Sequence, residues 1–324
     1  MTTRKDVARS AGVSEATVSH VINNTKYVSP ELEKKVRDAI SALDYRPNIV
    51  ARSLVTKTTN HVAILVSDLK NPYYAEIMEG MQEVAAREGY LVSLIRDGHG
   101  DSDEALNDLA YRYIDGIFIA TSRGNTPAIT RKLTELGIAV VTDIVVDYAS
   151  AEDTMMNYLT QLGHRRIAFI SGLEIAPGHD RYYCYVRGHE KFGLSFNEKL
   201  VVPGKPPYLT TIDSGYEAMK RLLETEPSVT AVFAVNDLTA IGAMRAIRDA
   251  GLKVPEDISV VGCDDIFLAD SVDPPLTTLR VPKKEMGRKA MYQLLHQIRE
   301  RKHEQSTVRA EFIVRSSTGS ARHS

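Results

Sequence analysis

The stretch DVARSAGVSEATVSHVIN, from Asp6 to Asn23, determines how the beginning of the chain folds. Within it, Gly12 interrupts one helical segment, and Ser14 can begin a second helix by capping its free backbone N–H groups. Apolar residues then recur at spacings of three and four, which gives this helix an apolar face of Val18, Val21 and Ile22. Two helices joined by a short turn with glycine predict a helix-turn-helix, whose second helix enters the DNA major groove. A short helical hairpin is also an ordinary structural unit, so the pattern alone leaves both interpretations open.

The residues on either side complete a small helical head. Thr3 and Asp6 have the spacing of a capping box at the start of the first helix. Ser29 and Pro30 are typical of the beginning of a third helix, because proline suits the first helical position. The apolar stripe of this third helix can close a three-helix core and consists of Leu32, Val36, Ala39, Ile40 and Leu43. We therefore expect a head over residues 1–47.

Residues 48–60 follow the head and include the sequence IVARSLVTKTTN. Ala51, Leu54 and Val55 would share one side of a helix, but a segment of this length is too short to be a stable helix alone. The segment is therefore either a plain linker or a linker that folds when DNA is bound.

From residue 61 onward, expected strands and helices alternate in two series. The expected strands are 62–67, 91–95, 116–120, 139–142, 167–171, 200–202, 231–235 and 259–262. The expected helices are 73–88, 103–113, 127–136, 151–162, 181–192, 214–225 and 238–250, then 282–301 before a last strand at 312–314. Repeated strand–helix units form parallel sheets covered by helices. The fold class is therefore α/β, with two similar lobes of doubly wound parallel sheets and a ligand site beyond their facing strand ends.

The charge of the chain is distributed unevenly. Residues 1–57 hold ten Lys or Arg against six Asp or Glu, a net charge of +4, within a chain whose net charge is -2. A basic head on an acidic body fits a local contact with nucleic acid. Cys184 and Cys263 form no CxxC pair, and neither a signal peptide nor an apolar run of 18 residues is present. We therefore expect a cytoplasmic protein without a disulfide framework or a metal site.

Two other classes of protein were weighed against a DNA-binding one. An enzyme is not expected, because no phosphate loop, HExxH motif or Ser/His/Asp set can be identified, so no catalytic residue and no cofactor is predicted. Asp264 and Asp265 could be paired carboxylates, but adjacent residues usually point apart. A solute-binding protein of a transporter would fit the two lobes, but not the missing signal peptide or the helix-turn-helix.

Several longer motifs together carry a family resemblance. They are KDVARSAGVSEATVSHVIN, YVSPELEKKVRDAISALDYRPN, VARSL, NPYYAEIMEGMQE, DGIFIA, LGHRRIAFI, SGYEAM, FAVNDLTAIGAMRAIRDAGLKVPEDISVVGCDDI and PPLTTLRVPKKEMG. From end to end the chain resembles the LacI/GalR family of bacterial transcription regulators. The resemblance implies a homodimer with DNA-binding heads, hinge helices and a core similar to periplasmic sugar-binding proteins. A small-molecule effector in the cleft would change the affinity for a palindromic operator.

The resemblance also implies which residues contact DNA. Glu15 and Ala16 match the specificity positions, and His20 stands where the family usually has arginine. Histidine can donate one hydrogen bond to guanine but cannot form the bidentate arginine pair. Leu54 matches the hinge leucine that wedges into the minor groove, which favours a folding hinge over a plain linker. The remaining expected DNA contacts, several of them to the phosphate backbone, are Thr3, Ser14, Thr17, Ser19, Asn23, Tyr27, Asn48 and Ala51.

In the core, the resemblance implies an effector site formed by Tyr73, Tyr74, Asp147, Arg181, Thr210, Asn236 and Asp264. Several matches depart from the family: Cys184 replaces a glycine, Thr210 an aromatic residue and Val281 a glutamine, and VVTDIVVDYAS is shorter than the family's loop. Asn236 could instead cap the following helix, and Asp264 could close a turn. Polar side chains with aromatic rings favour a sugar or sugar derivative as effector, with a purine or nucleoside as the alternative.

The expected domain boundaries follow from these assignments. After the head and the hinge segment, one core lobe takes residues 61–146 with about 282–305. The other lobe takes residues 147–281 with about 306–318, and residues 319–324 form a polar tail that we expect to be disordered. The tail lacks the leucine heptads of a tetramerisation segment.

Overall fold

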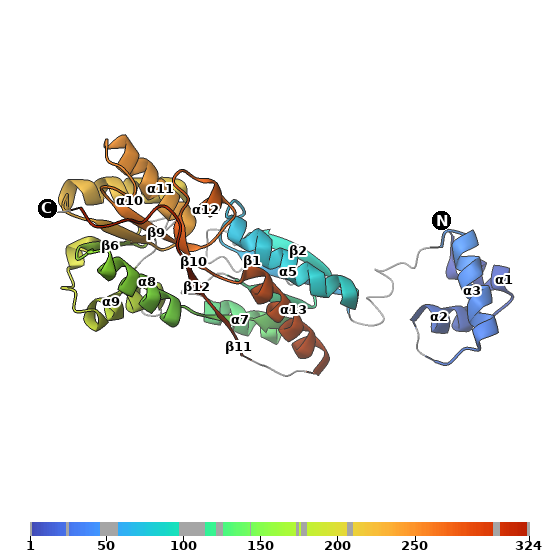
Figure 1. The fold of residues 1–324 in the computed structure, drawn as a ribbon. Helices are drawn as coiled ribbons and strands as arrows, with labels where there is room; N and C mark the ends of the chain where they lie inside the picture. Colours follow the sequence, from blue (N-terminus) through green and yellow to red (C-terminus); the bar gives the residue numbers. More distant parts are fainter. Residues whose placement is uncertain are drawn as a thin grey trace. The chain divides into compact units, whose positions relative to one another are not determined.

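The structure, a computed structural model, describes residues 2–23, 26–45, 58–96, 114–120, 126–142, 144–172, 175, 180–205, 210–300 and 305–322. The chain folds as two compact units, Met1–Thr59 and Asn60–Ser324. Figure 1 shows the elements of both units along the sequence.

The first unit contains three helices, α1 (Arg4–Ala11), α2 (Glu15–Asn23) and α3 (Pro30–Ala42). Thr3 and Asp6 form the expected capping box, and Gly12 ends α1 in a left-handed conformation with a φ of 67°. The buried core of this unit consists of Val7, Ala8, Val18, Val21, Val36, Ala39 and Tyr45. Ser29 is the N-cap of α3 and Pro30 its first residue, as predicted, although the Ser29 side chain makes no capping hydrogen bond. The prediction for Leu32 is wrong, because this residue is 36% exposed and does not belong to the core.

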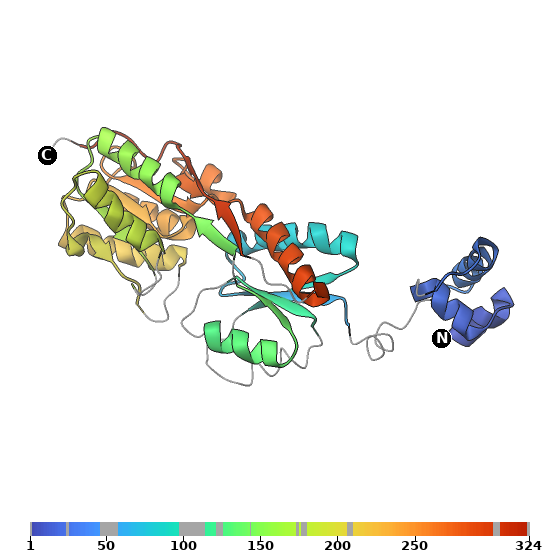
Figure 2. The same ribbon diagram turned by 90° about the horizontal axis from the view of Figure 1, so that it is seen from below.

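The second unit begins with a four-stranded parallel sheet in the order β2-β1-β3-β4. Its strands are β1 (His61–Val66), β2 (Leu91–Arg96), β3 (Gly116–Ile119) and β4 (Ala139–Val141). Alternate residues of β1 are buried in two different clusters, so helices cover both faces of the sheet. α5 (Pro72–Glu88) and α13 (Lys283–Glu300) cover one face, and α7 (Thr126–Glu135) covers the other (Figure 2). This sheet with its helices is called the first lobe.

A six-stranded sheet in the order β12-β10-β9-β8-β6-β7 forms the second lobe, with only β12 antiparallel. Its strands are β6 (Ile167–Ile170), β7 (Val201–Val202), β8 (Ala231–Ala234), β9 (Ser259–Asp264), β10 (Thr277–Arg280) and β12 (Glu311–Ile313). Its helices lie on both faces (Figure 1) and are α8 (Ala149–Gln161), α9 (Asp180–Lys191), α10 (Ile212–Thr225) and α11 (Asp237–Asp249). The short helices η1 (Glu198–Leu200) and α12 (Leu268–Ser271) complete it.

Between the two large sheets, β5 (Ile144–Asp147) and β11 (Ser306–Arg309) form a parallel pair. The chain leaves the first lobe through β5, returns to it after β10 and leaves it again through β11. The chain therefore crosses between the two lobes three times, and α13 lies in the first lobe although it follows β10 of the second.

Most predicted elements lie within two residues of their predicted positions, but β5, β10 and β11 were not predicted. The expected helix at 103–113 lies outside the described residues. The prediction of a disordered tail is wrong over residues 319–322, because hydrogen bonds hold this segment. The carbonyl of Gly319 is 3.0 Å from His164 Nε2, and the amide of Ala321 donates to the carbonyl of Leu162.

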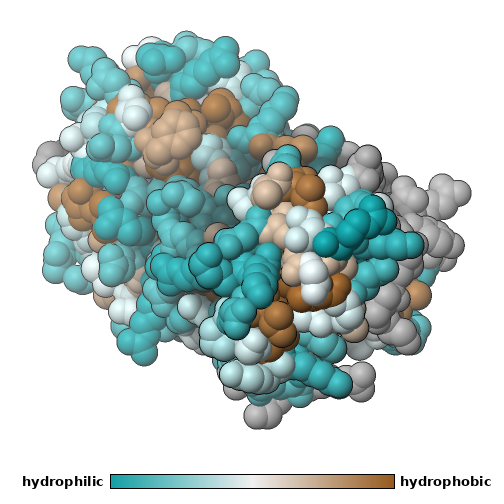
Figure 3. All heavy atoms as spheres, turned by 90° about the vertical axis from the view of Figure 1, so that its right-hand side faces the viewer, coloured by the Kyte–Doolittle hydropathy of each residue, from teal (hydrophilic) through white to brown (hydrophobic). Residues whose placement is uncertain are grey.

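The described helices include none that is long and apolar enough to cross a membrane. The molecular face in Figure 3 is mostly hydrophilic, with small and separate hydrophobic areas. Single exposed apolar residues of this kind are normal on a protein surface and need no special explanation.

Candidate functional sites

The exposed side of α2 is the candidate DNA-binding face. Val18 and Val21 are buried against α1 and α3, which fixes the orientation of the helix. The side facing away from this core carries two exposed residues, Glu15 and Ala16, and four half-buried ones, Thr17, Ser19, His20 and Asn23. A helix held by one apolar face can present the opposite face to the edges of DNA bases.

Three other residues expected at the DNA occupy different positions around this helix. The Ser14 hydroxyl accepts a hydrogen bond from the Thr17 amide over 3.1 Å, so Ser14 caps α2 as predicted. The Thr3 hydroxyl is engaged with the Asp6 carboxylate over 2.6 Å at the start of α1. Tyr27 is 89% exposed. The three expected hinge contacts, Asn48, Ala51 and Leu54, lie outside the described residues.

The candidate effector site is a polar cluster at the carboxyl end of β9. Arg181, near the start of α9, directs Nη1 to the Tyr148 hydroxyl over 3.4 Å and to Cys263 Sγ over 3.8 Å. Its guanidinium also lies over the Tyr148 ring, 5.4 Å from the centroid, which is a favourable cation–π geometry. Asp264 follows Cys263 at the end of β9 and is 5% exposed.

Two tyrosines at the start of α5 bring the first lobe to this cluster. The Tyr73 hydroxyl donates to Met286 Sδ over 3.6 Å, and the rings of Tyr73 and Tyr74 meet edge to face at 5.3 Å. The Tyr74 hydroxyl is 2.8 Å from Ser67 Oγ. Burial raises the pKa of Tyr73, and the negative charge of the Asp264 carboxylate adds to this increase.

The electrostatics of the cluster are dominated by burial. Burial raises the pKa of Asp264 to about 7, although the positive charges of Arg181 and Lys283 oppose this increase. A carboxyl with this pKa is present in both protonation states near neutral pH, so it can donate or accept a hydrogen bond. Burial also raises the pKa of Tyr148, and its hydroxyl therefore stays protonated. The residues of the cluster thus offer hydrogen-bond donors and acceptors at a site that is largely shielded from solvent.

The remaining predicted effector residues make local contacts. Asn236 caps α11, because its Oδ1 accepts from the Thr239 amide over 2.9 Å, as the alternative interpretation required. Its Nδ2 donates to the Thr210 carbonyl over 3.2 Å, which joins two of the predicted residues. Asp147 accepts from the amide of Ala149 and lies 3.8 Å from Arg309.

Sequence reasoning missed Tyr148 and Cys263 as members of the cluster. Tyr148 directly follows the predicted Asp147, and Cys263 directly precedes the predicted Asp264 in the same strand. The position of a residue at the carboxyl end of a parallel strand was therefore a usable signal for Cys263. No group of side chains suited to a metal ion is present among the described residues.

The geometry defines a class of protein: a helix-turn-helix head followed by an α/β core with a polar site between two sheets. Comparison with known proteins agrees with this class. Residues 3–48 match "Bacterial regulatory proteins, lacI family", and residues 156–318 match "Periplasmic binding protein-like domain". The chain therefore belongs to the LacI family of transcriptional regulators, with a ligand-binding core, as the sequence motifs indicated.

Individual relatives cover nearly the whole chain. The HTH-type transcriptional repressor PurR of Pasteurella multocida (strain Pm70) is 34% identical over 336 residues, which is 99% of each chain. The solved complex of the transcriptional regulator CelR with cellobiose is 31% identical, with a TM-score of 0.70, and covers 98% of this chain and 100% of its own. The Lac repressor dimer bound to operator and the anti-inducer ONPF is 25% identical, with a TM-score of 0.82, over 98% and 99% of the two chains.

Proposed function

We propose that this protein represses transcription as a homodimer on a palindromic operator, and that a sugar or sugar derivative bound by the Arg181–Asp264 cluster changes its operator affinity. The observation that carries the effector part is the cluster formed by the half-buried Arg181 guanidinium, the buried Asp264 carboxyl and three tyrosines from both lobes. Hydroxyl groups of a sugar donate to a carboxylate and accept from a guanidinium, so this cluster is complementary to them.

The arrangement of the rings favours a sugar over a flat base. One face of Tyr148 is occupied by the Arg181 guanidinium, and Tyr73 and Tyr74 are edge to face with an interplanar angle of 80°. A purine gains most from stacking on ring faces, whereas a sugar needs a single apolar surface and several hydrogen-bonding groups. The described part of the cluster offers an apolar surface with several hydrogen-bonding groups, which is the arrangement that suits a sugar. The relative in Pasteurella multocida carries a purine repressor's name, which keeps a purine or nucleoside as the second candidate.

On the DNA side, Glu15, Ala16 and His20 are the proposed base-reading residues, because they lie on the face of α2 opposite the core. Polar residues around them would contact phosphates and fix the register: Thr3, Ser14, Thr17, Ser19, Asn23 and Tyr27. The hinge proposal, in which Asn48 and Ala51 support the wedge of Leu54 at the operator centre, rests on the family motif alone.

A thermal-shift screen tests the effector class. Cellobiose, D-ribose and guanine are added to wild type, Arg181→Ala and Arg187→Ala; Arg187 is an exposed arginine on the same helix and serves as the control. We expect a sugar to raise the melting temperature of wild type and Arg187→Ala but not of Arg181→Ala. At 100 times Kd the stabilisation is about 2.7 kcal/mol. If only guanine raises the melting temperature, the effector is a purine and not a sugar. If the sugar raises the melting temperature of Arg181→Ala as much as that of wild type, Arg181 does not bind the effector.

A further inference from the structure

The backbone that carries Asp264 has an unusual conformation. Asp264 has a φ of 114° and the next residue, Asp265, has a φ of 53°. Residues with a side chain rarely adopt positive φ, and such strain persists only where surrounding contacts hold it. These two residues, called the aspartate corner, therefore need partners that fix them.

Lys283 supplies those partners from another element. The side chain of this first residue of α13 is 3% exposed. Its Nζ donates to the carbonyl of Asp264 over 2.6 Å and to the carbonyl of Asp265 over 2.8 Å. The same Nζ lies 3.5 Å from Glu76 Oε1 on α5. An ammonium group has three donors, and a buried one is costly unless they are satisfied. Lys283 thus meets three acceptors, two in the second lobe and one in the first.

The first-lobe end of this contact is rigid. α5 and α13 lie side by side (Figures 1 and 2) with their backbones in close approach. A Cβ atom on Gly80 would collide with the carbonyl of Lys284, and one on Gly287 would collide with the carbonyl of Ile77. Two helices packed this closely move as one body, so Glu76 and Lys283 keep their relative position.

The second-lobe end is held independently. The Asp265 carboxylate accepts from Arg280 Nε over 2.7 Å and from Arg315 Nη2 over 2.7 Å. Both arginines belong to the second lobe: Arg280 is the last residue of β10, and Arg315 follows β12. The aspartate corner is therefore fixed in its own sheet by Asp265 and attached to the α5–α13 pair by Lys283. A displacement of one lobe against the other has to break or stretch the contacts of Lys283.

From this geometry we infer that Lys283 is a positioning residue: it orients the effector-binding Asp264 carboxyl through the backbone and transmits its state to the α5–α13 pair. The inference rests on the proposed function, in which Asp264 contacts the effector. Lys283 itself does not touch the effector in this scheme. Its substitution should therefore separate two quantities that a general loss of stability would change together, namely effector response and resting operator binding.

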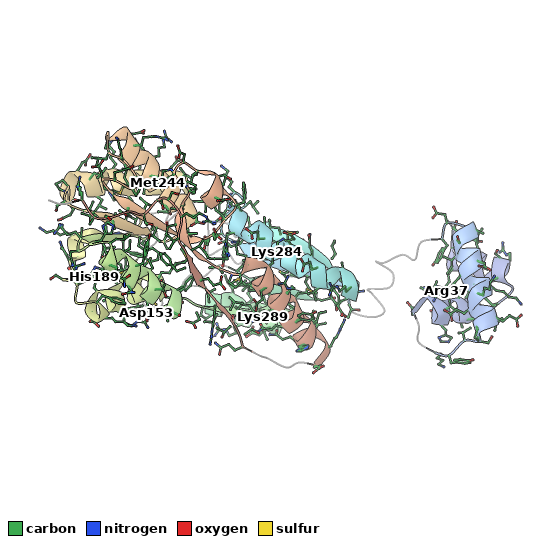
Figure 4. All side chains as sticks on the ribbon, viewed as in Figure 1. Arg37, Asp153, His189, Met244, Lys284 and Lys289 are labelled. Carbon is green, nitrogen blue, oxygen red and sulfur yellow. The ribbon has the colours of Figure 1, made fainter. Side chains whose placement is uncertain are left out.

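The test compares Lys283→Met with Lys284→Met. Lys284, labelled in Figure 4, is the next residue of α13. It forms an exposed ion pair with Glu79 over 2.9 Å, so it is a matched control. Operator Kd is measured by fluorescence anisotropy with and without the compound, among cellobiose, D-ribose and guanine, that stabilises wild type most. The allosteric factor is the ratio of the operator Kd values measured with and without the compound, and it is typically about 5–150-fold. In Lys283→Met we expect this factor to fall below about two, while operator binding without the compound is retained. In Lys284→Met we expect the factor to stay at the wild-type value. A wild-type factor in Lys283→Met would overturn the inference.

Two further measurements cover other outcomes. If Lys283→Met does not melt cooperatively, Glu76→Gln replaces it, because the Glu76 side chain is 33% exposed and tolerates change. We expect Glu76→Gln to reduce the factor at least threefold, and an unchanged factor would contradict the inference. If no compound acts on wild type, the proposed effector class fails. Amide hydrogen exchange without ligand then tests separately whether Lys283 holds the aspartate corner to the α5–α13 pair. Exchange in residues 264–268 and 73–80 should rise in Lys283→Met but not in Lys284→Met; equal exchange in all three proteins would refute it.

Discussion

Glu152, on α8, is a carboxylic acid buried without a hydrogen-bond partner. Its side chain is 1% exposed, and neither carboxyl oxygen has a partner among the described residues. Burial raises its pKa to about 9, although Arg181 and Arg187 act in the opposite direction. The group is therefore protonated at neutral pH and contributes no charge to the neighbouring cluster.

This pKa gives a stability prediction for Glu152→Gln. In the unfolded chain glutamate loses its proton near pH 4.5, whereas the folded chain keeps it up to about pH 9. The folded state of wild type therefore loses stability as pH rises from about 4.5 to about 9, by an amount on the order of a few kcal/mol. Glutamine has no such proton, so the melting temperature of Glu152→Gln should exceed that of wild type by a margin that grows over this pH range. Calorimetric melting at pH 5 to 9 measures this difference in melting temperature, with the exposed Glu190→Gln as the control. A difference that does not change with pH would contradict the prediction.

At the same scale, the sequence could identify some site residues and not others. Arg181 begins the expected helix 181–192, and Asp264 lies in a family motif just after the expected strand 259–262; the structure places both in one cluster. Lys283 could not be recognised, because a lysine at the start of a helix is ordinarily solvated. Its burial arises from the packing of α5 on α13 and from the aspartate corner, which lies 18 residues or more away in sequence. Asn236 has two interpretations from the sequence: its capping contact is observed, and its effector contact stays a prediction.

Among the elements, α2 carries the DNA-reading prediction. His20 lies half-buried on the helix face that also presents Glu15 and Ala16, whereas Val18 and Val21 point into the head. Arginine at this position can form two hydrogen bonds to guanine, each good bidentate pair being worth about 1–3 kcal/mol of discrimination. We expect His20→Arg to reorder the preference among half-site variants while nonspecific affinity changes much less. Binding to a half-site library measures this, and an unchanged order would show that His20 does not read bases.

Elements with a strong internal pattern were predictable, and elements defined by their partners were not. α10 and α11 have capping residues and a clear apolar face, and both were predicted to within two residues. β5 and β11 are four residues each and pair with one another across more than 150 residues of sequence. Their identity as strands depends on this pairing, which no local pattern contains.

At the scale of the whole molecule, the polar segment after β12 is held by the second-lobe sheet. The segment after β12 continues through buried Ser317, whose hydroxyl donates to the Val260 carbonyl over 2.6 Å. This contact explains why a polar sequence at the end of the chain is ordered: its polar groups are satisfied by the second-lobe sheet. Composition alone favoured disorder, because it does not show the acceptors that the sheet provides.

The uneven charge of the whole molecule predicts a steep salt dependence of operator binding. Residues 1–57, which comprise the head and most of the hinge segment, have a net charge of +4, while the rest of the chain is acidic and contributes no attraction to phosphate. If two heads contact about ten phosphates, the slope of log affinity against log salt should be near -9. Lys26 is exposed and adjoins the expected DNA contact Tyr27. If it contacts one phosphate in each head, Lys26→Gln should reduce the magnitude of this slope by about 2 in a dimer, since each lost phosphate contact releases about 0.9 fewer ions.

The control for this measurement is Lys253→Gln, which removes the same charge from an exposed position in the second unit. Because salt screens charges beyond about 10 Å at 0.1 M, a charge outside the DNA contact should leave the slope unchanged. Titrations of labelled operator between 50 and 200 mM salt, on the order of physiological ionic strength, give all three slopes. Equal reductions in both variants would mean that total charge, and not the head, governs binding, and a flat response in wild type would contradict the assignment of the head as the DNA-binding unit.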